Sequence, residues 1–174
     1  MSASSDAGPL IWLARCGNLR LLEKLYSGIV IPEAVYEEAV TRGIEEGYED
    51  ALIIRGAVEA GWIRVLKPSG RFMDEVKAGE RRRGVELGEG EREAMALALM
   101  EGARAFLTDD EDAHRAGVSL GLEPWGVLHV ILVSVRGRLM DKRQVRVALG
   151  KMLEGGFWLS PGIIHGFHEA LDKL

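Results

Sequence analysis

Cysteine and aromatic residues are scarce in this chain of 174 residues. The single cysteine, Cys16, excludes an internal disulfide and is typical of a protein from a reducing compartment. The most apolar segment, 126–135, is about half as long as a bilayer crossing requires. The opening residues MSASSDAGPL lack the basic and then apolar pattern of a signal peptide. We therefore expect a cytoplasmic protein without a membrane segment.

An excess of positive charge is also lacking. The formal net charge is −5, which argues against a surface that is basic throughout, although a metal site and a local basic strip would still allow nucleic-acid binding. Hydrophobic residues make up 47 % of the chain and charged residues 28 %, so there is material for a core and no sign of disorder. The length suits one domain, which we expect to span 1–174 with a helical extension from about residue 141.

The apolar pattern predicts short strands that alternate with helices. A polar stretch at 67–90 interrupts this pattern, and we expect a flexible crossing or a partly helical segment there. The acidic stretch at 44–50 is predicted to be a loop. The alternation indicates an α/β fold with a central parallel sheet, in which ligands bind at the carboxyl ends of the strands. The predicted strands are 1–5, 29–32, 63–66, 103–108 and 123–125.

Acidic residues recur where the predicted segments join. Asp6 and the pair Asp109 and Asp110 follow predicted strands, whereas Glu38 and Glu91 lie near the start of predicted helices. Carboxylates that meet at one edge of a sheet repel one another unless a cation neutralises them, and Mg²⁺ or Mn²⁺ prefers such oxygen ligands. Taken singly, each acid has a plainer explanation as a helix cap, a partner of a helix dipole or a solvated side chain.

These acidic strings, in this order and spacing, resemble the PIN-domain family. The resemblance runs from Ser5 to about Phe157, through SDAGPLIWLARCG, PEAVYEEAV, LGEGEREAMALA and FLTDDEDAHRAG. It is closest to the compact prokaryotic, VapC-like ribonucleases, in which the third acid lies in a Gly-Glu pair before an alanine-rich helix. The resemblance implies a PIN-like fold, with a parallel sheet of about five short strands flanked by helices.

The resemblance also implies a ribonuclease site that binds one or two Mg²⁺ or Mn²⁺ ions. A carboxylate-held ion of this kind activates water and stabilises charge on the leaving oxygen of a phosphodiester. We expect Asp6 and Asp110 to bind the metal directly, and Glu38 and Glu91 to act through water. The matched acids are, in chain order, Asp6, Glu38, Glu91 and either Asp110 or Asp109, with Asp112 as a further candidate.

Several positions depart from the family pattern. His114 stands where the family often has an arginine, although Arg115 is its neighbour, and 126–127 reads Gly-Val where a glycine-threonine step is common. The missing hydroxyl leaves a second hypothesis open, a PIN-like RNA- or protein-binding module with little catalysis. A phosphatase is disfavoured because Gly8 stands where that signature needs a second aspartate.

Two basic stretches are candidates for RNA contact. The predicted nucleic-acid-binding residues are Arg81, Arg82 and Arg83 and, apart from this run, Arg115. The alternative is that these arginines only form a solvated face. The leading hypothesis is a metal-dependent endoribonuclease, the toxin half of a toxin–antitoxin pair. RNA is then the substrate, and the family resemblance implies an antitoxin partner and a homodimer. The second basic stretch contains Arg136, Arg138, Lys142, Arg143 and Arg146.

Overall fold

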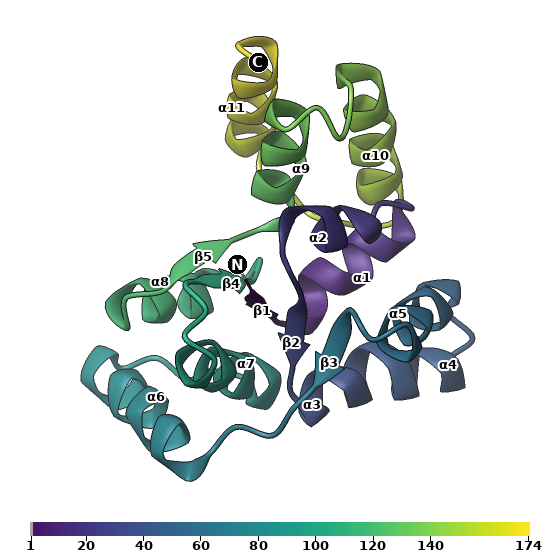
Figure 1. Ribbon diagram of the computed structural model, residues 1–174. Helices are drawn as coiled ribbons and strands as arrows, with labels where there is room; N and C mark the ends of the chain where they lie inside the picture. The colour runs from purple at the N-terminus through teal and green to yellow at the C-terminus, as the bar shows by residue number, and fades with distance from the viewer. Residues whose placement is uncertain (1) are drawn as a thin grey trace.

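A parallel sheet of five short strands forms the centre of the molecule, in the order β3-β2-β1-β4-β5 (Figure 1). The computed structural model describes residues 2–174, so the first residue of the predicted strand 1–5 lies outside the described part. Strand β1 is central and pairs with β2 on one side and β4 on the other. The predicted α/β fold is confirmed. The strands are β1 Ala3–Ser5, β2 Ile29–Ile31, β3 Ile63–Val65, β4 Ala105–Leu107 and β5 Glu123–Trp125.

Strand β1 is polar in sequence and yet fully buried. Ser4 and Ser5 each have 0 % exposure, so their hydroxyls need partners inside the protein. The Ser4 hydroxyl donates to the carbonyl of Ala94 at 2.7 Å, and the Ser5 hydroxyl donates to the carbonyl of Asp6 at 2.8 Å. The first of these bonds ties the centre of the sheet to the helix that covers it.

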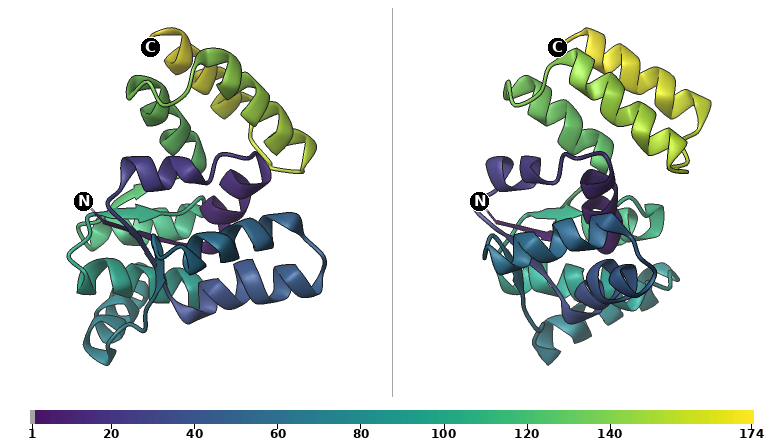
Figure 2. Two further views of the ribbon diagram at one scale, coloured as in Figure 1. Left: turned by 45° about the vertical axis from the view of Figure 1, so that its right-hand side comes forward. Right: turned by 90° about the vertical axis from the view of Figure 1, so that its right-hand side faces the viewer.

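Two layers of helices cover the sheet (Figures 1 and 2). One hydrophobic cluster joins β1, β2 and β4 to α1, α5, α9, α10 and α11, and a second joins Phe106 of β4 to α6, α7 and α8. Between Pro32 and Glu46 the chain forms one continuous helical segment with a π turn in its middle. The helical elements are α1 Ala7–Arg15, α2 Arg20–Leu25, α3 Glu33–Tyr36, η1 Glu37–Arg42, α4 Gly43–Glu45, α5 Glu49–Glu59, α6 Gly70–Arg83, α7 Glu89–Met100, α8 Glu111–Ser119, α9 Val127–Arg136, α10 Lys142–Glu154 and α11 Pro161–Asp172.

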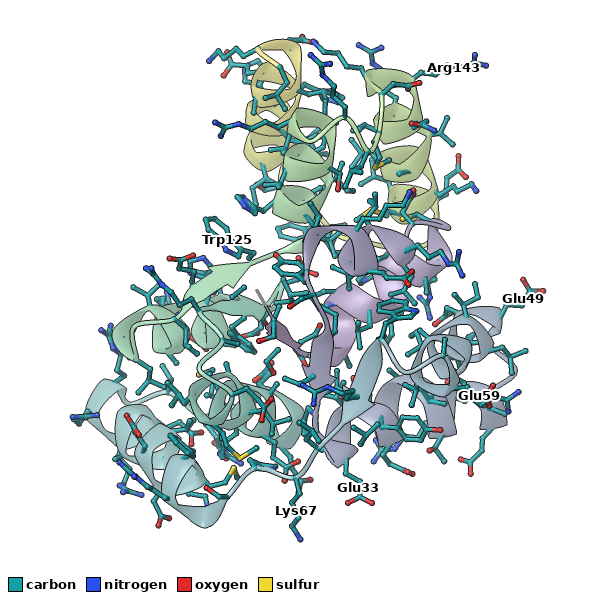
Figure 3. The ribbon with its side chains drawn as sticks, viewed as in Figure 1. Glu33, Glu49, Glu59, Lys67, Trp125 and Arg143 are labelled. Carbon is teal, nitrogen blue, oxygen red and sulfur yellow. The ribbon has the colours of Figure 1, made fainter. Side chains whose placement is uncertain are left out.

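The acidic stretch at 44–50 is a loop only at 46–48 and is helical on either side, so the prediction of a loop across the whole stretch was wrong. Helix α4 ends at Glu45, and α5 begins at Glu49, which points into solvent (Figure 3). Asp50 in the first turn of α5 is buried, and the Nε of Arg15 lies 3.2 Å from its carboxylate. This ion pair to α1 explains how an acid enters a packed helix.

The polar stretch at 67–90 contains the 14-residue helix α6, so of the two forms expected there the partly helical segment is confirmed. Val76 and Gly79 are buried in this helix, and so is Glu80, whose carboxylate accepts hydrogen bonds from Arg92 of α7 at 2.8 and 2.9 Å. The periodic apolar signal is weak because part of the packing between α6 and α7 is made by this ion pair.

The C-terminal helices α10 and α11 pack beside α9 at one end of the molecule (Figure 2). Met152 of α10 and Leu171 of α11 are fully buried and belong to the same cluster as the sheet residues Ile29 and Leu107. None of the helices in residues 2–174 combines the length and the apolar character that a bilayer crossing needs.

Candidate metal centre

The predicted acids come from segments that end at the carboxyl edge of the sheet. Asp6 follows β1 directly, and its backbone N–H donates to the carbonyl of Leu107 at the end of β4, at 2.9 Å. The Asp6 carboxylate also caps α1, since its Oδ1 accepts the N–H of Ala7 at 2.6 Å. The ends of β1 and β4 are therefore joined, and this places Asp6 and Asp109 at neighbouring strand ends.

Asp6, Glu38 and Glu91 line one hollow of about 270 Å³. Gly90 lies close to two of these acids, Asp6 and Glu38. A Cβ on Gly90 would lie 3.7 Å from Oδ1 of Asp6 and 4.0 Å from Oε2 of Glu38. Three of the predicted catalytic acids thus share one site. The full lining is Asp6, Ala34, Glu37, Glu38, Arg42, Gly88, Glu89, Gly90 and Glu91.

Glu38 is presented to this hollow by the π turn η1, Glu37–Arg42. A π turn closes its hydrogen bonds from residue i to i+5, so it is wider than an α turn and is frequent at functional sites. Four residues come close to a full turn in such a segment, and Glu38 and Arg42 both line the hollow. Sequence analysis did not single out Arg42, although its four-residue spacing from Glu38 is visible in the sequence.

Glu91 is held in place by its own helix start. Its Oε2 accepts the backbone N–H of Gly88 at 2.8 Å, which is the half of a capping box that runs from the N-cap backbone to the third residue of α7. Gly88 ends the segment 84–88, which is hydrogen-bonded to the Glu80–Arg92 pair. The N–H of Leu87 donates to Glu80 at 3.0 Å, and the carbonyl of Leu87 accepts from Arg92 at 2.7 Å. The position of Glu91 therefore depends on a buried network behind it.

Asp109 and Asp110 point in different directions. Oδ1 of Asp109 accepts the N–H of Val127 at 2.9 Å, and a Cβ on Gly8 would lie 3.9 Å from Oδ2 of Asp109, so this carboxylate faces the start of α1 beside Asp6. Oδ1 of Asp110 instead accepts the N–H of Ala113 at 2.8 Å and caps α8.

The pKa values of Asp6, Glu91 and Asp109 at this edge are raised by burial and, for Asp6 and Glu91, by neighbouring negative charges. Burial, with smaller contributions from Glu91, Glu38 and Asp109, raises the pKa of Asp6 to about 7. The pKa of Glu91 is raised by burial and then by the charges of Asp110 and Glu38. Solvent reaches the Asp109 side chain, but the protein around it replaces much of the nearby water and raises its pKa to about 6. The carboxylates are thus set close enough together to favour a counter-ion.

The donor set fits a hard divalent cation, because every acid named here offers carboxylate oxygens. Within residues 2–174, no three His, Cys, Asp or Glu side chains approach closely enough to form a complete metal cage. Mg²⁺ keeps several of its waters when it binds a protein, so two direct carboxylates are sufficient. Of the predicted ligands, Asp6 and Glu91 line the hollow, whereas Asp109 and Asp110 are not among its lining residues.

The predicted RNA-binding arginines do not line the acidic hollow. Arg82 and Arg83, at the end of α6, line a separate hollow with Ser119, and Arg81 faces a third one beside Arg92. Arg115 is engaged with its own helix, where it donates to Glu111 at 2.9 Å.

The second basic stretch is also remote from the acids. Arg143 extends from α10 away from the sheet (Figure 3), and Arg146 lies 4.0 Å from Asp172 of α11. Any contact between these arginines and RNA would be made outside the acidic hollow.

Comparison with known proteins places this chain in a family. A family model described as PIN domain matches residues 3–173. The solved structure of VapBC2 from Rickettsia felis bound to a DNA fragment from their promoter is similar, with a TM-score of 0.54 and 15 % identity over 72 % of this chain and 98 % of that one. PAE2754 from Pyrobaculum aerophilum has a TM-score of 0.51 and 18 % identity, over 80 % of this chain and 100 % of that one.

A search of curated proteins found no match. The two solved structures agree with this chain in fold, whereas the family model covers nearly all of its sequence. The chain belongs to the PIN-domain family.

Proposed function

We propose that this protein is a Mg²⁺- or Mn²⁺-dependent endoribonuclease of the PIN type. One observation carries the proposal: Asp6, Glu38 and Glu91, from three separate segments, line one hollow at the carboxyl edge of a parallel sheet. The raised pKa values of Asp6 and Glu91 support it, since burial, with a smaller contribution from neighbouring acids, disfavours their charged forms unless a cation is present.

In this proposal, Asp6 and Asp109 hold the ion. When bound, the ion supplies a Lewis acid and an activated water for hydrolysis of the phosphodiester. Glu38 and Glu91 would orient that water, one of the two carboxylates would accept the single proton that it loses, and Gly88 keeps Glu91 in place. The sequence favoured Asp110 as a direct ligand, with Asp109 as the alternative, and each of these carboxylates has one oxygen that accepts a backbone N–H. We assign the direct contact to Asp109 because its carboxylate faces the start of α1 beside Asp6, and Asp110 is the second candidate.

The partners follow from the family. Membership of the PIN-domain family and the similarity to VapBC2 support a role as the toxin of a toxin–antitoxin pair, with an antitoxin protein and a second copy of this chain as partners. RNA is the proposed substrate. Arg81, Arg82, Arg83 and Arg115 then contact RNA outside the acidic hollow.

A second candidate function is a PIN-like binding module with little catalysis. Val127 favours it, because the backbone N–H of this residue holds Asp109 and its side chain has no hydroxyl to offer.

One assay tests both candidates. Purified protein is mixed with structured RNA and Mg²⁺, and the reaction is repeated with EDTA, with Asp6→Asn and with Asp74→Asn, an exposed aspartate of α6 that serves as the matched control. We expect cleavage by the wild type and the control only. Cleavage that persists with EDTA or with Asp6→Asn would overturn the mechanism, and RNA binding without cleavage would favour the binding module.

A further inference from the structure

We infer that Arg42 binds a backbone phosphate of the RNA at the acidic hollow. This inference rests on the proposed function and adds to it the positively charged side chain that binds the negatively charged phosphate of the substrate. Arg42 is the one basic residue among those that line this hollow in the described part of the chain, beside the acids Asp6, Glu38 and Glu91. The acids alone would repel an approaching phosphate, and a positively charged side chain on the same wall offsets this repulsion.

Arg42 is not engaged by the protein. In residues 2–174 it takes part in none of the ion pairs, although several glutamates line the same hollow. Arg15 and Arg92 contrast with it, because their guanidinium groups are held by the buried carboxylates of Asp50 and Glu80. The charge of Arg42 is therefore free for a ligand, and the side chain is exposed.

The local backbone supports this assignment. Ala34, Glu38 and Arg42 follow one another at intervals of four residues, and all three line the hollow. The π turn from Glu37 to Arg42 widens the helix here and keeps residues four apart close to one line. The small side chain of Ala34 leaves space beside Glu38, and Arg42 occupies the last position of the turn.

The chemistry of the guanidinium group suits this position. Its planar set of N–H donors matches two oxygens of one phosphate, and it stays charged at any working pH. A phosphodiester between the acids and Arg42 would have one of its two non-bridging oxygens toward the metal position and the other toward the guanidinium. Arg42 is thus a substrate-contacting residue, distinct from the acids that hold the ion.

The test measures binding and cleavage with Arg42→Ala, Arg42→Lys and the control Arg20→Ala. Arg20 suits the control because its side chain is 83 % exposed and lies 3.9 Å from Glu23 on α2. Binding is measured by fluorescence anisotropy with a short, fluorescein-labelled single-stranded DNA of mixed sequence in the presence of Mg²⁺, since DNA offers the same phosphates. Cleavage of the matching RNA gives KM, kcat and the Mg²⁺ concentration at half-saturation.

We expect Arg42→Ala to weaken DNA binding about tenfold. The slope of log affinity against log salt should shrink by about 0.7, the value for one phosphate contact on a single strand. Arg42→Lys should recover the salt slope and part of the affinity. Half-saturation by Mg²⁺ should stay the same or fall for Arg42→Ala, because a positive charge near the ion is removed. A residue with a merely structural role would weaken Mg²⁺ binding as well.

The inference is overturned if Arg42→Ala binds DNA as tightly as Arg20→Ala does, or if the wild type does not bind the strand at all. It is also overturned if Mg²⁺ affinity falls together with DNA affinity. Failure of the proposed function gives a different result. The wild type then shows no Mg²⁺-dependent RNA cleavage, while Arg42→Ala still binds DNA more weakly than Arg20→Ala in the anisotropy measurement.

Discussion

Gly126 and Asp109 lie so close together that a methyl group would not fit between them. A Cβ on Gly126 would lie 2.6 Å from Oδ1 of Asp109, the same oxygen that accepts the N–H of Val127 at 2.9 Å. The backbone of Gly126 has φ −83° and ψ 172°, which any residue can adopt. Glycine is therefore needed at this position by the carboxylate and not by the turn itself.

The substitution Gly126→Ala should displace the Asp109 carboxylate and lower metal-dependent cleavage by about tenfold or more, since small displacements of catalytic groups have large effects. The folded state should lose no more than about 1–3 kcal/mol, because a short side chain gives way instead of the backbone. RNA cleavage against Mg²⁺ concentration and urea unfolding measure the two effects. Gly150→Ala in α10, where the added Cβ meets nothing within 4 Å, is the control and should leave cleavage unchanged.

The adjacent acids Asp109 and Asp110 should respond differently to the same substitution. Asp109→Asn removes a charge beside Asp6 and is expected to raise the Mg²⁺ requirement and lower cleavage by about 100-fold, the scale of a lost metal ligand or its support. Asp110→Asn keeps the cap of α8, because asparagine caps helices as well as aspartate does, and should lower cleavage less. Mg²⁺ titrations of both variants decide the matter, and a larger effect at Asp110 would return the direct ligand to that residue.

The order of the elements could be predicted from local signals in the sequence, whereas the choice of Asp6, Glu38 and Glu91 among the nearby acids came from the resemblance to the PIN-domain family. The acids Asp6, Glu38 and Glu91 stand at the ends of recognisable segments, and the structure brings them to one hollow. The choice between Asp109 and Asp110 could not be predicted, since two identical neighbours differ only in which N–H each accepts, and Val127 lies 18 residues beyond Asp109.

Helix α6 was only one of two alternatives expected at 67–90, for a related reason. Its buried Glu80 carries no apolar signal, and the residue that makes this burial possible, Arg92, lies 12 positions further along the chain. Strand β1 was recognised only weakly because its serines are satisfied by carbonyls such as that of Ala94, a contact no local pattern reveals. Long-range polar contacts thus decided the parts of the fold that hydrophobic periodicity left open.

Metal-free protein should be stabilised by Asp6→Asn. The pKa of Asp6 is raised from 3.8 to about 7 in the folded state, so the folded protein binds this proton more tightly than the unfolded chain, and stability falls as the pH rises between these values. The variant keeps the cap of α1 and lacks the charge. Above pH 7 we expect the free energy of unfolding to increase by about 2 kcal/mol, a discounted value because Asp6 is partly exposed.

Urea unfolding with EDTA measures this difference, which should vanish below pH 3.8, where Asp6 is protonated in both states. The exposed Asp74→Asn is the control. Added Mg²⁺ should stabilise the wild type more than Asp6→Asn, because the ion binds the charged carboxylate. Equal stabilisation of the two proteins by Mg²⁺ would contradict the assignment of Asp6 as a ligand.

Loss of the charge on Glu80 should destabilise the protein and loosen the segment that presents Glu91. Hydrogen bonds from Arg92 and Leu87 lower the pKa of Glu80 below 4.5, so its contribution to stability is present above that pH and is lost as the pH falls through the folded-state pKa. Glu80→Gln leaves Arg92 without its counter-charge and should cost about 1–3 kcal/mol at neutral pH. Because Gly88 and Glu91 follow directly, we also expect a higher Mg²⁺ concentration at half-saturation.

Glu101→Gln is the matched control, since it breaks the exposed Arg64–Glu101 pair of 3.2 Å and should cost less than about 1 kcal/mol. Equal losses in the two variants, measured by urea unfolding, would show that the network behind Glu91 contributes no more than a surface ion pair.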